Sequence, residues 1–215
     1  MNSINGALRG IIQIPEICYT DYEKGEEQMS SHKEAKYNVS QIADWLLLYN
    51  QANVDNNEAD LISNLKMQKL LYYAQGTSLA FNGYPLFNEP ILSWTHGPIV
   101  RKAYDRFSET HDSGIQPQGF CVKKPNLDSI DEALLEAVYN KYNRYSAWEL
   151  VHMTHQEDPW KNTKQNEEIP LSVIEAYFKN TLYKKVFDGT LFDDIPTVEP
   201  LYRNEEGVPV FPAEQ

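Results

Sequence analysis

The segment LKMQKLLYYAQGTSLAF, residues 65–81, decides the fold class because its apolar residues recur with the period of an α-helix. The recurring positions are Met67, Leu70, Leu71, Ala74, Ser78 and Phe81. This spacing of three and four residues predicts a helix with one face toward a hydrophobic core. Gly83 follows shortly after, and glycine is common just past a helix C-terminus, so we expect the helix to end there.

Helical spacing also appears on both sides of this segment. Ser40 is placed to cap an earlier helix, since a serine oxygen can accept a free backbone N–H. The core-facing residues of that helix are Ile42, Ala43, Trp45, Leu46 and Tyr49. Pro98 suits the first position of a third helix, where no N–H is needed. Its expected inward residues are Ile99, Val100, Ala103, Tyr104 and Phe107.

Short strands are predicted between these helices. The stretch YPLFNEPILSW, residues 84–94, contains Pro85 and Pro90, and prolines this close exclude a helix. Its apolar end, Ile91 to Trp94, suits a short edge strand, and HGP then makes a turn. A second short strand is predicted within residues 114–122, GIQPQGFCV.

Three S-x-x-E patterns predict the starts of the later helices, because serine and glutamate at this spacing can cap each other's backbone N–H groups. The pairs are Ser129 with Glu132, Ser146 with Glu149, and Ser172 with Glu175. Pro159 is expected to close the middle helix of these three. The sequence therefore predicts a mainly α fold. We expect a compact bundle of about six helices, with a small β hairpin or two short strands between helices two and four.

Charge and composition limit the classes of partner. The chain of 215 residues has a net charge of −12, which disfavours nucleic acid as a partner. From residue 186 onward there are seven carboxylates and one arginine, a net charge of −6 that would attract a basic protein surface. The carboxylates are Asp188, Asp193, Asp194, Glu199, Glu205, Glu206 and Glu214.

The chain is expected to consist of three parts. Residues 1–36 are interpreted as an N-terminal extension and linker, residues 37–185 as the helical domain, and residues 186–215 as an acidic, proline-rich tail. Only two cysteines are present, and the longest early apolar run, residues 11–17, is broken by polar residues and proline. We therefore expect a cytoplasmic protein with no membrane partner.

The clearest candidate for chemistry is SAWELVHMTHQEDPW, residues 146–160, which places Glu149, His152 and His155 at intervals of three. Glu-x-x-His occurs in di-iron bundles, but those sites need a second such motif and further glutamates. A small metal-dependent hydrolase using these three residues is the enzyme-class alternative. We favour a structural helix, with Glu149 in a capping box and His155 near the negative end of the helix dipole.

The order of motifs resembles the Panacea domain of SocA-like and GepA-like antitoxins, which occur in bacteria and prophages. The motifs are LKMQKLLYYAQG (65–76), WTHGPIVRKAY (94–104), SAWELVHMTHQEDPW (146–160) and a final helix ending in AYFKN (176–180). The resemblance spans about residues 39–180.

This resemblance implies a mostly helical antitoxin of a type II toxin–antitoxin system, which neutralises a co-encoded toxin by direct contact and uses no cofactor or catalytic residue. Members of the family are paired with very different toxins. One known member instead delivers its toxin to a bacterial protease. A proteolysis adaptor, with a protease or chaperone as a further partner, or a phage-encoded inhibitor of a host protein is therefore the alternative within the binding class.

Aromatic and polar residues of the shared motifs are the candidate contacts to a toxin with a basic surface. They are expected to frame one concave face, because their segments close on each other in a bundle. The candidates are Tyr72, Tyr73, Gln75, Trp94, His96, Trp148, His155 and Trp160, with Asp193 and Asp194 of the acidic tail. The alternative for each motif residue is a place in an aromatic core with its polar groups satisfied.

Overall fold

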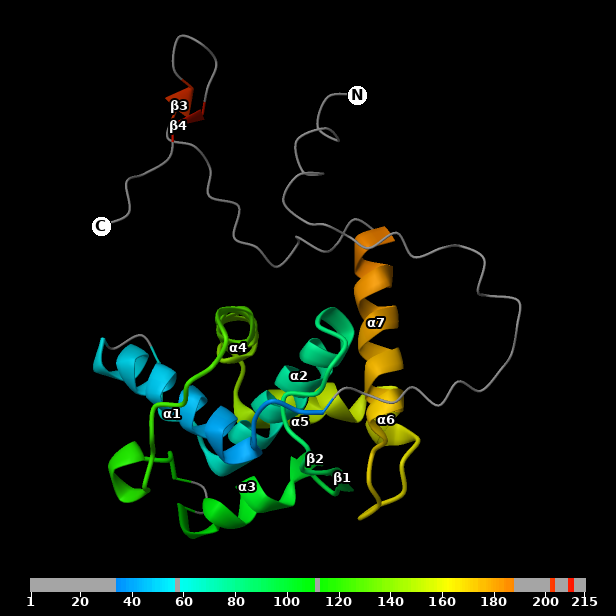
Figure 1. Ribbon diagram of the computed structural model, residues 1–215, viewed down its shortest axis with the longest axis horizontal. Coiled ribbons are helices and arrows are strands. Elements are labelled where there is room, and N and C mark those ends of the chain that lie inside the picture. Colours follow the sequence, from blue (N-terminus) through cyan, green and yellow to red (C-terminus); the bar gives the residue numbers. More distant parts are fainter. Residues whose placement is uncertain (1–33, 57–58, 111–112, 188–201, 204–208, 211–215) are drawn as a thin grey trace, which may run out of the picture. The chain divides into compact units, whose positions relative to one another are not determined.

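The fold is mainly helical, as the sequence predicts, and is seen in a computed structural model of the chain (Figure 1). The structure describes residues 34–56, 59–110, 113–187, 202–203 and 209–210. Their α-helices are α1 (Val39–Asp55), α2 (Asn64–Phe81), α3 (Arg101–Arg106), α4 (Ser129–Tyr142), α5 (Ala147–His155), α6 (Asp158–Lys161) and α7 (Leu171–Phe187). The 3-10 helices are η3 (Ser108–Thr110) and η4 (Pro117–Gly119). Antiparallel hairpins are formed by β1 (Ile91–Trp94) with β2 (Gly97–Val100), and by β3 (Tyr202–Arg203) with β4 (Pro209–Val210).

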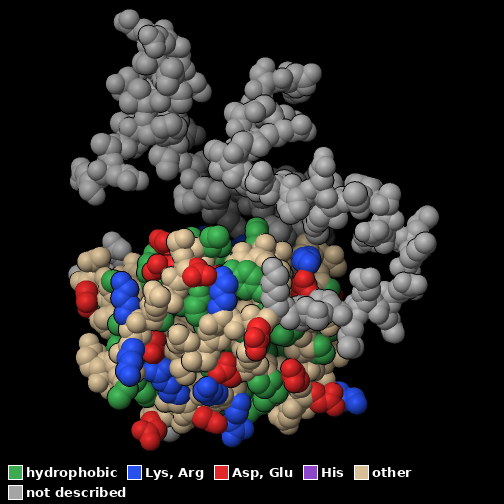
Figure 2. Space-filling model, in the orientation of Figure 1, with side chains coloured by type: hydrophobic (Ala, Val, Ile, Leu, Met, Phe, Trp, Pro, Cys, Tyr) green, Lys and Arg blue, Asp and Glu red, His purple; other side chains and the backbone are tan. Residues whose placement is uncertain are grey.

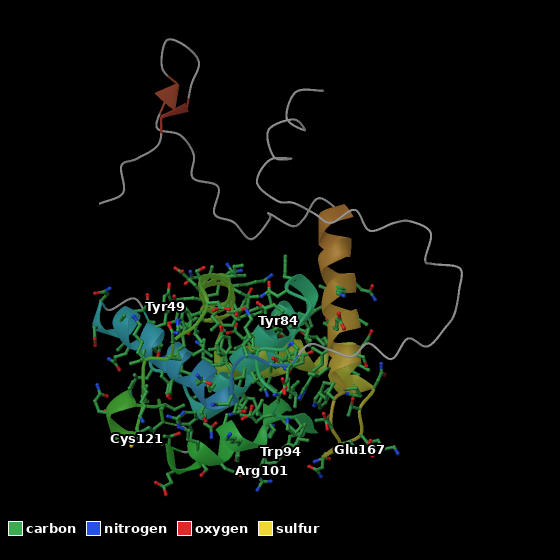
Figure 3. All side chains as sticks on the ribbon, in the orientation of Figure 1. Tyr49, Tyr84, Trp94, Arg101, Cys121 and Glu167 are labelled. Carbon is green, nitrogen blue, oxygen red and sulfur yellow. The ribbon has the colours of Figure 1, made fainter. Side chains whose placement is uncertain are left out.

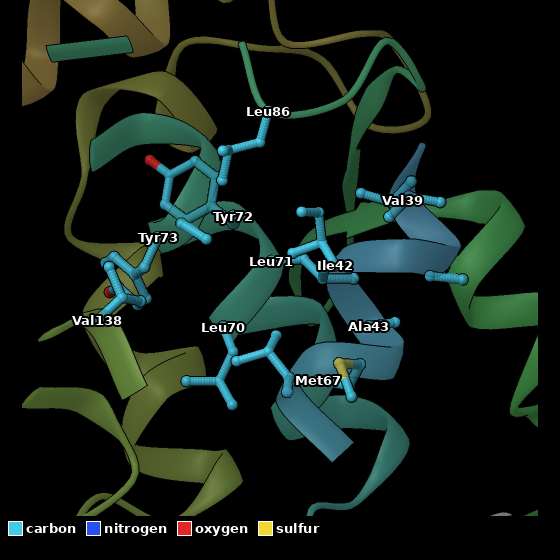
Figure 4. Close-up of a cluster of buried hydrophobic side chains, with 14 of the residues drawn as sticks. Val39, Ile42, Ala43, Met67, Leu70, Leu71, Tyr72, Tyr73, Leu86 and Val138 are labelled. Atoms are coloured by element: carbon cyan, nitrogen blue, oxygen red, sulfur yellow. The ribbon is translucent and has the colours of Figure 1, made fainter. Parts of the chain in front are cut away.

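α2 is the central helix of the described core, and 13 of its 18 residues are buried. It packs against α1, α4, α5, α7 and β2. Figure 4 shows its aliphatic side chains within the core, with Leu71 facing Ile42 of α1. The helix predicted over residues 65–81 is confirmed. The buried surface of this helix is wider than the predicted apolar face, because several of its polar residues are buried as well.

The last position of the predicted stripe is wrong. Phe81 is 62% exposed, whereas Leu79 is fully buried. Neighbouring elements cover α2 on most sides, so the core-facing side of its last turn differs from that of its earlier turns. Leu79 therefore faces the core in place of Phe81. Ser78, by contrast, is buried as expected, and its hydroxyl donates to the carbonyl of Tyr84.

The starts of α1 and α5 are both fixed by capping boxes. α5 begins as predicted, since the Glu149 N–H donates to Ser146 Oγ and the Ser146 N–H donates to Glu149 Oε2. The prediction for α1 is wrong by two residues. Its cap is Asn38, which pairs reciprocally with Gln41, and Ser40 lies inside the first turn. Asparagine is as good an N-cap as serine, so the earlier start is physically reasonable.

The other two predicted capping boxes are wrong. The N-cap of α4 is Asp128, so Ser129, the predicted cap, is already the first residue of the helix. Glu132 accepts a hydrogen bond from Trp45 Nε1 at 3.1 Å and does not bond the cap. Ser172 is the second residue of α7, and Glu175 bonds Lys179 one turn further on. A cap contributes only about 1 kcal/mol, so a tertiary partner for the glutamate can outweigh it.

Pro159 does not end the helix that precedes it. α5 ends at His155, and Pro159 lies in the first turn of the separate helix α6. Proline suits a first turn because the N–H there has no partner within the helix. The expected break in the chain is therefore present, and a new short helix begins at the proline.

The hairpin replaces the predicted start of the third helix. Ile91 pairs with Val100 and Trp94 pairs with Gly97, so Pro98 lies in β2 and α3 begins only at Arg101. The predicted strand within residues 114–122 is wrong as well. That stretch contains η4 and a single bridge between Ser63 and Gly114. The expected β hairpin between helices two and four is nevertheless confirmed.

The outer edge of β1 is covered by the segment that precedes α7. The Ser93 N–H donates to the Glu167 carbonyl, the Asn166 N–H donates to the Ser93 carbonyl, and the Ile169 N–H donates to the Ile91 carbonyl. This segment acts as a third strand, so the edge of the hairpin does not present free backbone groups to solvent. Among the described residues, no helix is both long enough and apolar enough to cross a membrane.

A fully buried carboxylate ties the start of the described chain to α4. Asp131 accepts hydrogen bonds from Lys36, Tyr37, Asn82 and Tyr84. The hydrogen bonds to Asp128, Tyr84 and Asp131 raise the pKa of Lys36 well above its usual range, so its ammonium remains charged. Lys36, which the sequence assigned to the linker, therefore makes specific contacts with the helical domain.

A second buried carboxylate, Glu157, lies between α5 and α6. Its two carboxylate oxygens accept from the hydroxyls of Tyr72, at 2.7 Å, and Tyr73, at 3.0 Å. Burial raises the pKa of Glu157 to about 7, although both tyrosine hydrogen bonds act in the opposite direction. Glu157 therefore makes the stability of the core depend on pH between mildly acidic and neutral conditions.

Replacing Gly76 should weaken the packing of α2 against α7. A Cβ at this position would lie 2.4 Å from Cε2 of Phe178. Gly76→Ala should lower the free energy of unfolding by about 1–3 kcal/mol, because overpacking outweighs the gain in helix propensity. Denaturant unfolding measures this, and Gly76→Ala with Phe178→Leu should recover part of the loss. Gly119→Ala, whose Cβ would meet nothing within 4 Å, is the control. Equal losses in the two alanine variants would contradict the predicted contact.

Glu157→Gln should change how stability varies with pH. Between about pH 4.5 and 7 the unfolded chain has lost the Glu157 proton while the folded chain retains it, so the free energy of unfolding falls as pH rises. The stabilisation that comes from the proton on Glu157 is fully present below about pH 4.5 and is lost above about pH 7. Denaturant unfolding across this range should show a smaller fall in Glu157→Gln than in the wild-type chain. Identical pH profiles for the two proteins would contradict the assignment.

Candidate functional site

The hairpin of β1 and β2 ends in a two-residue turn, Thr95–His96, and both residues are exposed. Gly97, which follows, has a φ of 91°, a left-handed conformation that glycine adopts readily. A side chain here would also collide with its surroundings, because an added Cβ would lie 2.6 Å from Thr154 Oγ1. The turn therefore reverses the chain sharply against α5 and leaves Thr95 and His96 at the surface. We call these two residues the hairpin tip.

Two buried side chains of α2 bond the inner edge of the hairpin. The Val100 N–H donates to Gln68 Oε1 at 3.0 Å, and Lys69 Nζ donates to the Pro98 carbonyl at 2.9 Å. Gln68 and Lys69 are both fully buried. They take the place of a neighbouring strand, so the backbone polar groups at these two positions of β2 are satisfied by a helix.

The opposite flank of the hairpin tip is held by α5 and α6. Trp160 Nε1 donates to the Trp94 carbonyl at 2.8 Å. The Trp160 indole stacks on the His155 ring at 3.9 Å between centroids. Side chains of α2 on one flank and of α5 and α6 on the other therefore fix the backbone of the hairpin, and three separate segments of the chain meet here.

These three segments are the motifs that carried the family resemblance. α2 contains the first motif, β1 and β2 the second, and α5 with α6 the third. The motifs are far apart in the chain, and the hydrogen bonds described above are the contacts through which they meet. The structure thus gives a physical reason why these three motifs occur together.

An exposed surface with aromatic, histidine and arginine side chains surrounds the hairpin tip. Trp148 of α5 is 62% exposed, and the His96 ring meets it edge-on at 5.2 Å between centroids. The Arg101 guanidinium lies 5.3 Å from the centre of the Trp94 ring, and Figure 3 shows these two side chains next to each other. His152, also exposed, follows Trp148 by one helical turn. We call the five residues Trp94, His96, Arg101, Trp148 and His152 the tip surface.

The predicted contact residues divide into two groups. Trp94, His96, Trp148, His155 and Trp160 come together at the tip surface or directly beneath it. Arg101 was missed by the sequence analysis, which named His152 only as a candidate for metal chemistry; each lies within a motif that the sequence analysis had identified.

Tyr72, Tyr73 and Gln75 lie in the interior instead and do not reach the surface. Gln75 bonds the backbone of residues 86 and 87, and the tyrosine hydroxyls bond Glu157. Their arrangement matches the alternative of an aromatic core with satisfied polar groups. Asp193 and Asp194 lie outside the described residues.

The acidic and histidine side chains of α5 do not form a metal-binding group. Glu149 Oε2 accepts from both the backbone N–H and the hydroxyl of Ser146. Within residues 34–56, 59–110 and 113–187, no three His, Cys, Asp or Glu side chains are placed to hold a metal ion. Burial, and then the charge of Lys69, lower the pKa of His155. A neutral ring is suited to stacking on Trp160 beneath the hairpin tip.

Lys69 is the functional candidate that sequence reasoning missed entirely. A lysine in a helix of mixed polarity is ordinarily read as solvent-exposed. Lys69 is buried because other elements cover α2 on most sides, and hydrophobic periodicity does not reveal this. Its sequence neighbours, Gln68 and Leu70, give no signal of this burial.

Comparisons with known proteins agree with this motif geometry. Residues 67–161 match the family described as Antitoxin SocA-like, Panacea domain. The chain is also similar to a protein of Caulobacter vibrioides (strain NA1000 / CB15N) named Antitoxin SocA, with 34% identity over 110 residues. The match covers 46% of this chain and 58% of that protein, so the chain spans somewhat less than two thirds of the relative's length. No solved structure matches the chain.

The matched residues begin in the first turns of α2 and end at the last residue of α6. They include α2, the β1–β2 hairpin, α5 and α6, and therefore every element that holds the hairpin tip. The match to the SocA-like Panacea domain thus covers the part of the chain that builds and holds the hairpin tip.

Proposed function

We propose that the chain is the antitoxin of a type II toxin–antitoxin system and that it neutralises a co-encoded protein toxin by binding it directly. The Panacea domain and the similarity to a protein named Antitoxin SocA support an antitoxin role. The structural observation that carries the direct-binding mode is Trp148, a large aromatic side chain left 62% exposed beside a hairpin tip that buried donors hold in place.

The tip surface has the chemistry of a protein-binding site. Tryptophan and arginine are enriched among the residues that dominate binding energy, and both are present here. Aromatic side chains supply contact area at a small entropic cost, and a turn whose backbone is already fixed loses little further freedom on binding. These features favour recognition of another protein. We therefore propose that the chain acts by binding and carries no reactive centre of its own.

Electrostatics support a basic toxin surface. On the face shown in Figure 2, acidic and basic side chains are interspersed, so the described domain carries no single-sign field there. The charge asymmetry comes from the tail, which has a net charge of −6 after residue 185. A toxin that acts on RNA or nucleotides needs a cationic cleft, and an acidic tail can occupy such a cleft in place of phosphates.

The proposed function is tested with the genes that flank the gene of this protein. Each flanking reading frame is expressed alone and together with this chain, and cell growth is measured. One flanking product should arrest growth alone and be harmless in the presence of the chain, and the two proteins should copurify. Direct blocking also requires that neutralisation persists in cells that lack ATP-dependent proteases. If no flanking product is toxic, or if rescue depends on a protease, the proposal is wrong.

Trp148→Ala should reduce toxin affinity by about tenfold or more, because truncating an interface tryptophan commonly costs about 2 kcal/mol or more. Its effect on stability should be small, since the side chain is 62% exposed. Ile130→Ala on α4 is the matched control, because Ile130 is 66% exposed and lies on another element. Calorimetric titration gives both affinities and thermal unfolding gives both stabilities. Equal affinities in the two variants would exclude Trp148 from the interface.

Asp193→Asn with Asp194→Asn should weaken toxin binding mainly at low salt. Removing two charges from a tail that approaches a basic cleft lowers the Coulomb attraction, which salt screens over about 10 Å at 0.1 M. The affinity of this double variant should therefore vary less with salt than that of the wild-type chain. The control is Glu205→Gln with Glu206→Gln, which removes the same charge further along the tail. An unchanged salt dependence in both double variants would rule out a contribution from the tail.

A further inference from the structure

We propose that Lys69 is a positioning residue for toxin recognition: its buried ammonium holds the Pro98 carbonyl and thereby fixes the hairpin tip in the form that the toxin binds. This inference rests on the proposed antitoxin function and deepens it. It assigns a recognition role to a side chain that never reaches the surface and that no comparison with known proteins singles out.

The geometry places Lys69 directly beneath the turn. Its Nζ lies 2.9 Å from the Pro98 carbonyl oxygen, and a Cβ added to Gly97 would lie 2.9 Å from the same nitrogen. The backbone at residues 97 and 98 thus packs directly against the end of the Lys69 side chain. His96, one residue earlier, carries the ring that meets Trp148. A shift of the carbonyl that Lys69 holds would therefore move the exposed tip.

A purely structural role does not explain why this position is a lysine. A buried charge is costly to desolvate, and a hydrophobic side chain of similar volume often stabilises a core better. Gln68 already provides a neutral hydrogen bond to the same strand through Val100. The ammonium adds a charge-assisted bond, which is stronger and more strictly directed than a neutral one. A protein interface needs a hairpin tip with a fixed backbone orientation, and a directed hydrogen bond to the Pro98 carbonyl provides it.

The protonation state of Lys69 is finely balanced. Burial lowers the pKa of Lys69 to about 7, so the ammonium and the neutral amine are both populated near neutrality. His155 is the titratable neighbour on α5, and burial, followed by the charge of Lys69, lowers the pKa of His155. If the ammonium positions the tip, toxin binding must favour protonated Lys69, and linkage then requires a higher pKa in the complex.

Lys69→Met tests the proposal, because methionine fills similar space without a donor. Toxin affinity should fall by about tenfold or more, while stability is retained or increased because a buried charge has been removed. Asn50→Leu is the matched control. Asn50 is also buried and also bonds loop backbone, at the Asp60 carbonyl and the Ile62 N–H, but this loop is distant in sequence from the tip. The control should lose stability and keep its affinity.

A double-mutant cycle separates positioning from a general effect on the fold. Lys69→Met, His96→Ala and the combined variant are compared by calorimetric titration with toxin. If Lys69 acts through the tip, its substitution should cost much less affinity once the His96 ring is absent. Additive losses would show that Lys69 acts elsewhere and would overturn the proposal. Unchanged affinity in Lys69→Met alone would also overturn it.

A measurement on the wild-type chain keeps the proposal testable if Lys69→Met does not fold. Lysine labelled with carbon-13 at Cε reports the Lys69 titration by NMR in the free chain and in the toxin complex. The pKa should be higher in the complex, and an unchanged or lower value would contradict the positioning role. Failure of the wild-type chain to bind any flanking gene product would instead remove the proposed function itself, so the two failures are distinguishable.

Discussion

The structure depends on one constraint, which is that every polar group on the buried helix α2 must find a partner inside the protein. A buried polar group without a hydrogen bond costs about 1–3 kcal/mol, a large fraction of the stability of a domain. Gln68 and Lys69 bond β2, and Gln75 bonds the loop at residues 86 and 87. The positions of these loops therefore follow from the polar residues of α2 as much as from the apolar ones.

This constraint explains which parts of the fold the sequence could predict. The helix at residues 65–81 and the cap at Ser146 rest on contacts between residues close together in the chain, and both were predicted correctly. β2 is different, because its bonds to α2 join residues 29 and 32 positions apart in the chain. Pro98 locally favours a helix start. Tertiary hydrogen bonds outweigh that preference, and the helix begins after the strand instead.

The candidate site shows the same division between local and distant information. The sequence identified the aromatic and histidine residues of three motifs, and five of them meet around the hairpin tip. It could not separate Trp148, which is exposed, from Tyr72 and Tyr73, which are buried. The spacing along a helix predicts only how its side chains are oriented relative to one another. Which direction is interior depends on partners such as Glu157, 84 residues after Tyr73.

The arrangement at the hairpin tip separates the residues that hold the backbone from the residues that a partner can touch. Lys69, Gln68 and Trp160 act on backbone carbonyl or N–H groups, so their role does not depend on which side chains occupy the turn. Trp148 and His96 contribute exposed rings that can change with little effect on the core. A buried frame of this kind allows surface side chains to be exchanged while the backbone of the turn stays in place. A domain built in this way is physically suited to recognising different partners through one backbone geometry, because specificity lies in side chains that carry little of the folding energy.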